Sequence, residues 1–359
     1  MIHLNRRRLL GALGAAAALP LAPRLGRAQD GPLKVAFVYI GPVGDFGWTY
    51  AHEQGRLMVE EHFGDAVETT YVENVAEGPD AERIIRQLAQ EGNQLIFTTS
   101  FGYMNPTVRV AKQFPDVYFE HATGYQRADN LAIYNARFYE GRAVIGTMAA
   151  MMSETGTAGY IASFPIPEVV MGINAFQLAA AKVNPDFKTQ VVWVSTWYDP
   201  AKEADAARAL LDQGADIITQ HTDSPAALQA AEERGAFAFG QATDMSQFAP
   251  KAHLTAIVDN WGPYYVQRVQ AALDGTWEST DTWAGIADGE VVLSEFRENV
   301  PPEVADAARK VEAGIKDGSF SIFTGPIYDQ AGELRVPEGE TLADADLLSM
   351  DWYVQGVQS

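Results

Sequence analysis

Aromatic and polar residues follow most of the segments that the sequence predicts to be buried strands. Planar ligands are held by the faces of Trp, Tyr and Phe, while a few carboxylates, amides and hydroxyls fix their orientation. Because aromatic residues recur at several strand ends, the pattern predicts a pocket for a flat heteroaromatic molecule. The residues expected to line this pocket are Tyr39, Asp45, Phe46, Trp48, Phe101, Trp197, Asp223, Gln241, Asp244 and Asp259.

Several of these residues also have a structural interpretation. A Trp that follows a strand packs two lobes together about as often as it stacks on a ligand. Asp223 precedes Ser224-Pro225 at the predicted start of a helix, so a helix N-cap is an equal alternative for it, and Asp244 has the same alternative. His221 has no partner in a His-x-x-x-His pair, and it is interpreted as a hydrogen-bonded structural residue rather than a metal ligand.

The motifs of common enzyme classes are missing from the sequence. It contains no Gly-x-Ser-x-Gly elbow, no His-Glu-x-x-His pair and no phosphate loop, and Gly41, Gly44 and Gly47 are spaced wrongly for a dinucleotide. A carboxylate pair such as Asp244 and Asp259 could serve acid–base chemistry, but carboxylates are abundant in this chain. The missing motifs and the predicted pocket therefore favour a binding protein without catalysis, cofactor or metal, with an enzyme as a minor alternative.

The residues that position the pocket begin with the stretch 33–55. It contains a buried strand at 34–40, a Gly/Pro loop and a helix that starts near Trp48, which is the opening of a βαβ unit. Strand and helix then alternate to about residue 123, with a helix at 80–91 whose expected N-cap is Asp80. The periodicity is lost at 123–135, where we expect a crossing between two lobes, and the alternation then continues to about residue 258. We therefore predict an α/β fold with parallel sheets in two lobes, and ligands sit beyond the carboxyl ends of such strands.

The first 28 residues have the pattern of an export signal. Two consecutive arginines, Arg6 and Arg7, lead into a short Ala/Leu run and a small-x-Ala site at Gly26-Arg27-Ala28. This predicts a signal of the twin-arginine type, cleaved near Ala28, and a periplasmic location. No later segment is apolar enough to cross a membrane, so no membrane anchor is expected.

The charge and the cysteine content exclude several other classes. The chain has a net charge of −21, and removing the predicted signal takes away five arginines and no acid. Such a chain is a poor candidate for binding nucleic acid or an anionic membrane surface. Cysteine is absent, which excludes disulfides, thiolate metal sites, a cysteine nucleophile and a lipid-modified N-terminal cysteine.

The sequence from about Leu33 to the C-terminus resembles the basic membrane protein family, the purine-nucleoside-receptor-like substrate-binding proteins of ABC importers. The most specific parts are Phe-Tyr-Glu-Gly at 138–141 and Asp-Pro-x-Lys-Glu at 199–203, followed by Gly-Ala-Asp at 214–216. The resemblance implies a type I periplasmic-binding-protein fold, in which two doubly wound parallel-sheet lobes are joined by a hinge. It also implies a monomer that delivers a purine base or nucleoside to an ABC permease and its ATPase.

The resemblance further implies a division of the chain and a mode of ligand binding. Lobe 1 is expected at 33–123 and 255–285, lobe 2 at 138–245 and 289–320, and a C-terminal tail that packs on the lobes at 321–359. The family's two stacking aromatics fall on Trp48 and on Trp197 or Tyr198, which predicts two rings sandwiching one purine.

The sequence departs from the family pattern at three positions, and two of these departures concern the sugar. Tyr39 stands where nucleoside-binding members carry an Asp, and Thr123 and Asp259 replace the Asp and Lys that grip the ribose hydroxyls in the family. We therefore hypothesise a free base such as adenine, whose exocyclic amine would donate to Asp259 or Asp244. A nucleoside receptor and a ligand sensor for a membrane signalling receptor are the alternatives.

Overall fold

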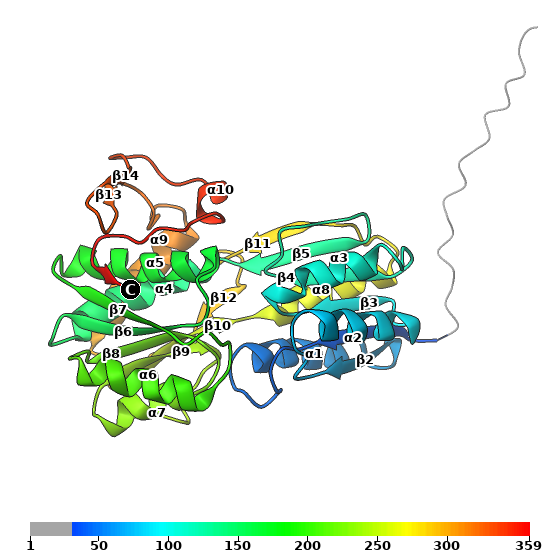
Figure 1. Cartoon of the computed structure of the whole chain (residues 1–359), viewed down its shortest axis with the longest axis horizontal. Coiled ribbons are helices and arrows are strands. Elements are labelled where there is room, and N and C mark those ends of the chain that lie inside the picture. The colour runs from blue at the N-terminus through cyan, green and yellow to red at the C-terminus, as the bar shows by residue number, and fades with distance from the viewer. Residues whose placement is uncertain (1–30) are drawn as a thin grey trace, which may run out of the picture. The chain divides into compact units, whose positions relative to one another are not determined.

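Two mainly parallel β-sheets organise residues 31–359, which are the residues that the computed structural model describes; the predicted export signal and its cleavage site lie outside them. The first sheet has the strand order β11-β5-β4-β3-β1-β2, and all its pairings are parallel. The second has the order β12-β10-β9-β8-β6-β7-β15, in which only β12 runs antiparallel to its neighbour. Helices cover both faces of each sheet (Figure 1). The predicted fold class is confirmed.

The first lobe is the first sheet with four helices. Side chains of β1 alternate between two cores: Val35 and Phe37 pack toward α1 and α8, whereas Ala36 and Val38 pack toward α2 and α3. This alternation explains why the strand is apolar throughout. The elements are β1 Leu33–Val38, α1 Trp48–Phe63, β2 Val67–Val72, α2 Pro79–Gln90, β3 Leu95–Thr98, α3 Met104–Ala111, β4 Tyr118–Ala122, β5 Leu131–Ala136, α8 Trp261–Leu273 and β11 Asp281–Ala284.

The second lobe is the second sheet with the helices α4, α5, α6, α7 and α9 and the C-terminal segment. Helices α4 and α5 pack closely on one face, where Gly146 lies against the carbonyl of Phe176, and α6 and α7 cover the other face. The elements are α4 Phe138–Met152, β6 Thr157–Ala162, α5 Pro167–Val183, β7 Lys188–Trp193, α6 Pro200–Asp212, β8 Ile217–His221, α7 Ala226–Glu233, β9 Phe237–Ala242, β10 His253–Asp259, β12 Val291–Leu293 and α9 Pro302–Lys316.

The C-terminal segment 321–359 packs on the second lobe. It forms a small hairpin, β13 Ile327–Tyr328 with β14 Leu334–Val336, then α10 Asp344–Leu347 and β15 Val357–Gln358, which extends the second sheet beside β7. The side-chain amide of Asn174 on α5 donates to the Trp352 carbonyl and accepts from the Val354 amide, at 2.8 and 3.0 Å. No helix within residues 31–359 is long and apolar enough to cross a membrane.

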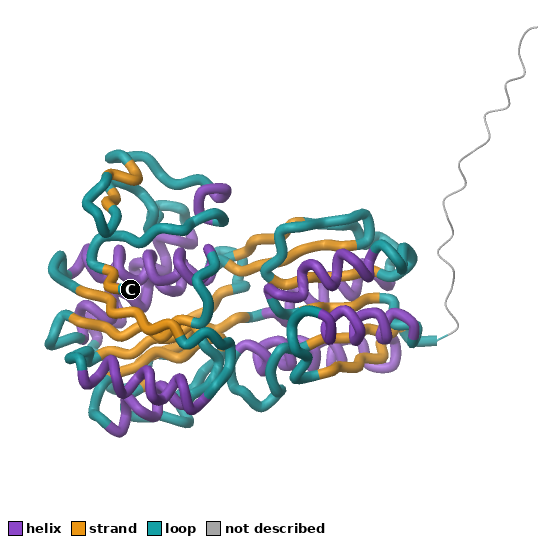
Figure 2. The backbone as a smooth tube through the Cα atoms, viewed as in Figure 1, coloured by secondary structure: helices purple, strands orange, loops and turns teal. Residues whose placement is uncertain are grey.

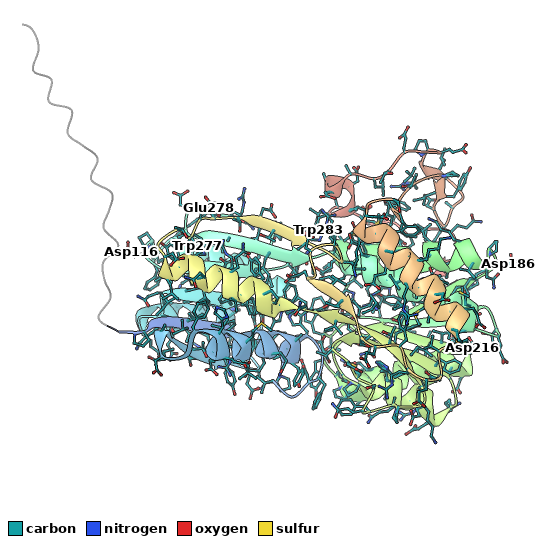
Figure 3. All side chains as sticks on the ribbon, turned by 180° about the vertical axis from the view of Figure 1, so that it is seen from behind. Asp116, Asp186, Asp216, Trp277, Glu278 and Trp283 are labelled. Atoms are coloured by element: carbon teal, nitrogen blue, oxygen red, sulfur yellow. The ribbon has the colours of Figure 1, made fainter. Side chains whose placement is uncertain are left out.

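The chain passes between the two sheets three times (Figure 2). The crossings are at Arg137, between β5 and α4, at Asn260, between β10 and α8, and at 285–290, between β11 and β12. Backbone hydrogen bonds join them, from Arg137 N to the Ala284 carbonyl at 2.7 Å and from Asn260 N to the Glu290 carbonyl at 2.8 Å. Figure 3 shows Trp283 at the end of β11 nearer to the crossing and Trp277 at the opposite end. The three crossings form the connection about which the lobes can rotate.

Three sequence-based expectations differ from the structure. The segment 123–135 is not a crossing, because β5 begins at Leu131 and pairs with β4 and β11 inside the first sheet. The expected lobe boundary at 255 is wrong, since β10 pairs with β9 in the second sheet and only α8 and β11 return to the first. Asp80 is not an N-cap, because α2 already begins at Pro79 after Gly78. In the first two cases strand pairing over long sequence separation decided the outcome.

A buried ion pair joins α8 to the first sheet. The carboxylate of Glu120 on β4 accepts hydrogen bonds from Arg268 Nε at 2.5 Å, Trp277 Nε1 at 2.7 Å and the Tyr264 hydroxyl at 2.8 Å. Glu120 is fully buried; burial raises its pKa, and the charge of Arg268 acts in the opposite direction. The network therefore ties the last helix of the first lobe to the centre of its sheet.

Replacing Glu120 by Gln should lower the free energy of unfolding by about 3 to 5 kcal/mol, because it leaves the buried guanidinium of Arg268 without a counter-charge. Chemical denaturation monitored by circular dichroism measures this. The matched control is Glu312→Gln, which breaks the more exposed pair with Lys316 and should cost less than about 1 kcal/mol. Equal losses in the two variants would show that the buried pair has no special role.

Candidate ligand-binding site

A pocket lies where the carboxyl ends of the strands in the two sheets face each other. The space between its atoms is about 410 Å³ when the open solvent at its mouth is included. Ligands of open α/β sheets bind at this end of the strands. The first lobe contributes residues that follow β1, β3 and β4 and begin α1. The second lobe contributes residues from the start of α5 and from the ends of β7, β8 and β9 or just after them. The lining residues are Ile40, Trp48, Ser100, Phe101, Thr123, Glu168, Trp197, His221, Asp223 and Gln241.

Each lobe supplies one indole to this pocket. Trp48 donates its Nε1 hydrogen to the Thr99 carbonyl at 2.6 Å, and its ring meets His52 and Trp261 edge to face at 4.3 and 5.5 Å between centroids. Trp197 packs against Phe164 at 5.1 Å, and its Nε1 has no hydrogen-bond partner among the described residues. The ring of Trp48 is therefore fixed in orientation, whereas Trp197 keeps a free donor.

Asp45 anchors the loop that carries Trp48. Its carboxylate accepts hydrogen bonds from the backbone amides of Gly47 and Tyr50 at 2.9 Å each and of Thr49 at 3.1 Å. These bonds provide partners for backbone N–H groups at the start of α1, which have no acceptor within the helix. Burial raises the pKa of Asp45 to about 6, although these amides act in the opposite direction. Asp45 does not line the pocket. Its contacts position the first turn of α1.

Of the ten residues expected in the pocket, Trp48, Phe101, Trp197, Asp223 and Gln241 line it. The alternative of Asp223 as an N-cap is wrong, since α7 begins at Ala226 without a side-chain cap. Asp223 is buried, and its amide donates to the Trp197 carbonyl at 3.1 Å. Burial raises its pKa well above the usual range, and the nearby charges of Asp45 and Glu203 act in the same direction.

The structure places four further expected residues elsewhere. Tyr39 points into the first-lobe core, where its hydroxyl donates to Glu53 at 3.1 Å. The ring of Phe46 packs on Phe248 in the other lobe, and its carbonyl accepts from Thr243 Oγ1. The Asp244 side chain is 44% exposed and bonds the Ser246 amide at 2.8 Å. Asp259 is buried behind the lining, close to Arg142, with no partner for either oxygen among the described residues.

Sequence reasoning missed an acidic and imidazole pair in the second-lobe wall. Glu168, in the first turn of α5, lies with Oε1 at 3.6 Å from His221 Nε2. Burial lowers the pKa of His221, while Glu168 acts in the opposite direction. His221 ends β8, so the strand-end rule points to it, although its type alone favoured a structural interpretation. Glu168 lies in α5, six residues after the end of β6, which is beyond the residues that directly follow a strand.

The chemistry offered by the pocket is hydrogen bonding and stacking. Residues 31–359 contain no group of three or more His, Cys, Asp or Glu side chains arranged to hold a metal ion. The fully buried Arg142 approaches the pocket only from behind, where it bonds Thr219, the Gln220 carbonyl and the Gln241 side chain. The walls therefore combine indole faces with several hydrogen-bond acceptors.

The lobes meet directly beside the pocket. Gly47, at the start of α1, lies so close to the backbone of Asp223 that a methyl group at its Cα would overlap it. The Phe46 carbonyl and Thr243 hydroxyl add a hydrogen bond across the same contact. The structure therefore shows the two lobes closed on each other at this point.

This architecture, two parallel α/β lobes with a pocket between their strand ends, is the fold of the periplasmic-binding-protein type. An ABC transporter solute-binding protein from Aeropyrum pernix has the same fold, with a TM-score of 0.69 and 18% identity over 81% of this chain and 93% of that one. The model of the family of PnrA-like ABC transporter substrate-binding proteins matches residues 33–323. The chain belongs to this family, which confirms the resemblance seen in the sequence.

Two relatives cover most of the chain. A purine-binding protein of Brucella abortus is 61% identical over 325 residues, which are 90% of this chain and 93% of the relative. A Haloferax volcanii protein whose name describes it as an ABC transporter glucose-binding protein is 40% identical over 304 residues, 85% of this chain and 77% of the relative. The family is one of substrate-binding proteins that serve transporters.

Replacing Gly47 by Ala should disfavour the closed arrangement, because the added methyl group would overlap the Asp223 backbone. Overpacking of about 1 to 3 kcal/mol would shift the closed-to-open ratio by roughly 5- to 150-fold, which small-angle X-ray scattering would detect as a larger radius of gyration. The matched control is Gly44→Ala, since a methyl group there meets no atom within 4 Å. Identical scattering from both variants would contradict this role for Gly47.

Proposed function

We propose that the protein captures a purine nucleobase of the adenine type outside the cytoplasm and delivers it to an ABC permease with its ATPase. The observation that carries the proposal is the pair Trp48 and Trp197, which enter one pocket from opposite lobes. Two indoles on the faces of one planar ring suit a heteroaromatic ligand. The name of the Brucella abortus relative, a purine-binding protein, supports the same ligand class.

The preference for a base over a nucleoside rests on the first-lobe wall. Thr123 lines the pocket with its hydroxyl turned to the Ala122 carbonyl at 2.7 Å, so the wall has no carboxylate at this position. Asp259 lies behind the lining and is not available to a sugar. A ribose would therefore lack the charged partners that its hydroxyls need in water-excluded surroundings.

A second candidate function, nucleoside capture, is favoured by a vestibule of about 1060 Å³ beside the pocket. The vestibule shares Phe101, Thr123 and Glu168 with the pocket. It continues past Asn135 and Asp281, whose polar groups could accept hydrogen bonds from sugar hydroxyls. A ribose attached to a base in the pocket would extend into this space.

The proposal has three further parts. The twin-arginine export signal predicted from residues 1–28 would bring the mature chain to the periplasm. A monomer, as the family resemblance implies, would exchange ligand with the permease there. Binding and release by rotation about the three crossings would need no covalent chemistry. A role as ligand sensor for a signalling receptor would use the same closure with a different membrane partner.

Titration calorimetry of ligand-stripped protein with adenine, adenosine and glucose tests the ligand class. Adenine should bind tightest, and Trp197→Ala should weaken it roughly 10- to 100-fold, which corresponds to the lost burial and stacking of one indole. Trp352→Ala is the matched control, because Trp352 lies in the C-terminal segment and does not line the pocket.

If adenosine binds more tightly than adenine, the proposed ligand becomes a nucleoside rather than a free base. Binding of glucose without any purine would contradict the proposal and favour the chemistry named for the Haloferax volcanii relative. If Trp197→Ala leaves the adenine affinity unchanged, the proposed stacking of the ligand between two indoles is wrong, but the proposed ligand class still stands.

A further inference from the structure

Two polar side chains of the second-lobe wall, Glu168 and Gln241, face the pocket with opposite hydrogen-bonding character. One is an acceptor and the other presents a donor, for reasons that the surrounding contacts determine. A purine carries its own donors and acceptors on its edges, so such a pair can distinguish one purine from another. The inference below rests on the proposed function, since it concerns which purine the pocket selects.

The orientation of the Gln241 amide is set by Arg142. This guanidinium is fully buried and donates to Thr219 Oγ1 at 3.1 Å, to the Gln220 carbonyl at 2.8 Å and to Gln241 Oε1. Arginine has donors only, so it requires the amide oxygen of Gln241 on its own side. The amide nitrogen then points away from Arg142, and no hydrogen bond is formed by it among residues 31–359. Gln241 thus offers the pocket a donor.

Glu168 offers an acceptor that the protein leaves unused. Its Oε1 faces His221, while Oε2 is buried and has no partner among the described residues. His221 does not neutralise it, because burial favours the uncharged imidazole by lowering its pKa. A buried carboxylate oxygen without a hydrogen bond is costly, so a donor on the ligand would stabilise this arrangement.

We infer that Glu168 and Gln241 together select a 6-aminopurine over a 6-oxopurine. On one edge adenine presents an amine donor beside the acceptor N7, whereas a 6-oxopurine presents two acceptors, O6 and N7, on the same edge. The amine can donate to Glu168 while N7 accepts from Gln241. A 6-oxopurine in the same pose would place O6 against the carboxylate, where two acceptors repel each other.

The competing explanation is that Glu168 only stabilises the start of α5. An acid in the first turn interacts favourably with the helix dipole wherever the helix lies. The chain holds a matched case in Glu303, which follows Pro302 at the start of α9 as Glu168 follows Pro167, but is exposed and far from the pocket lining. If the role is purely structural, substitution at either position should have the same effect on purine affinity. If Glu168 contributes to selectivity, only its substitution should change purine affinity.

Calorimetric titration of adenine and hypoxanthine into the wild type, Glu168→Gln and Glu303→Gln tests the inference. The wild type should bind adenine at least tenfold more tightly than hypoxanthine. Glu168→Gln should weaken adenine about tenfold and bring the two affinities together, because the new amide can turn its donor to O6. Glu303→Gln should keep both wild-type affinities.

Several outcomes would overturn the inference. A wild-type preference for hypoxanthine, or an adenine-to-hypoxanthine ratio that Glu168→Gln leaves unchanged, would remove it while purine capture stands. Failure of the wild type to bind any purine would instead remove the proposed function beneath it. If Glu168→Gln does not fold, Gln241→Glu replaces the donor by a second acceptor beside Arg142 and should weaken adenine by a similar factor; unchanged adenine binding there would equally overturn the inference.

Discussion

The carboxylate of Asp45 fixes the position on which the binding site depends. By accepting three backbone amides it holds the first turn of α1 in place, and that turn carries both Trp48 and Gly47. Trp48 forms one wall of the pocket, and Gly47 is one of the points at which the two lobes touch. One buried acid therefore connects helix capping, the aromatic wall and lobe closure. A residue that does not line the pocket can still decide its geometry.

The charged residues of the site also divide into those that line the pocket and those that lie behind the lining. The acceptors Glu168 and Asp223 reach the pocket, whereas Arg142 approaches only from behind and orients Gln241. Burial raises the pKa of Asp223 and Asp259 well above the usual range, because a charged carboxylate is poorly solvated there. Anionic ligands would meet the same difficulty, which is consistent with a neutral heteroaromatic ligand.

The C-terminal segment is connected to the hinge as well as to the second lobe. Arg137, at the first crossing, makes a two-pronged ion pair with Asp344 of α10 and stacks over Trp283, 4.0 Å from the ring centroid. Asp344 is half exposed, so the pair by itself contributes little to stability. Its position is nevertheless informative, since a segment that packs on one lobe also contacts Arg137 at a crossing between the lobes.

The order of residues alone was enough to predict the fold class, the family and half of the pocket. Strand and helix periodicity depends on neighbouring residues, and the rule that ligands sit beyond the carboxyl ends of parallel strands then pointed to Trp48, Phe101 and Trp197. These predictions required no knowledge of which strands pair. They succeeded because the same strand ends meet in any fold of this class.

The tertiary structure decided everything that depends on contacts between distant segments. Tyr39 and Phe101 both follow a first-sheet strand, yet one side chain enters the core and the other the pocket, because the face that a side chain reaches depends on the twist and covering of the sheet. The membership of β10 in the second sheet was settled by pairing with β9. The roles of Glu168 and Gln241 arise only when α5, β9 and Arg142 are brought together, since a hydrogen-bonding direction is a property of neighbours in space.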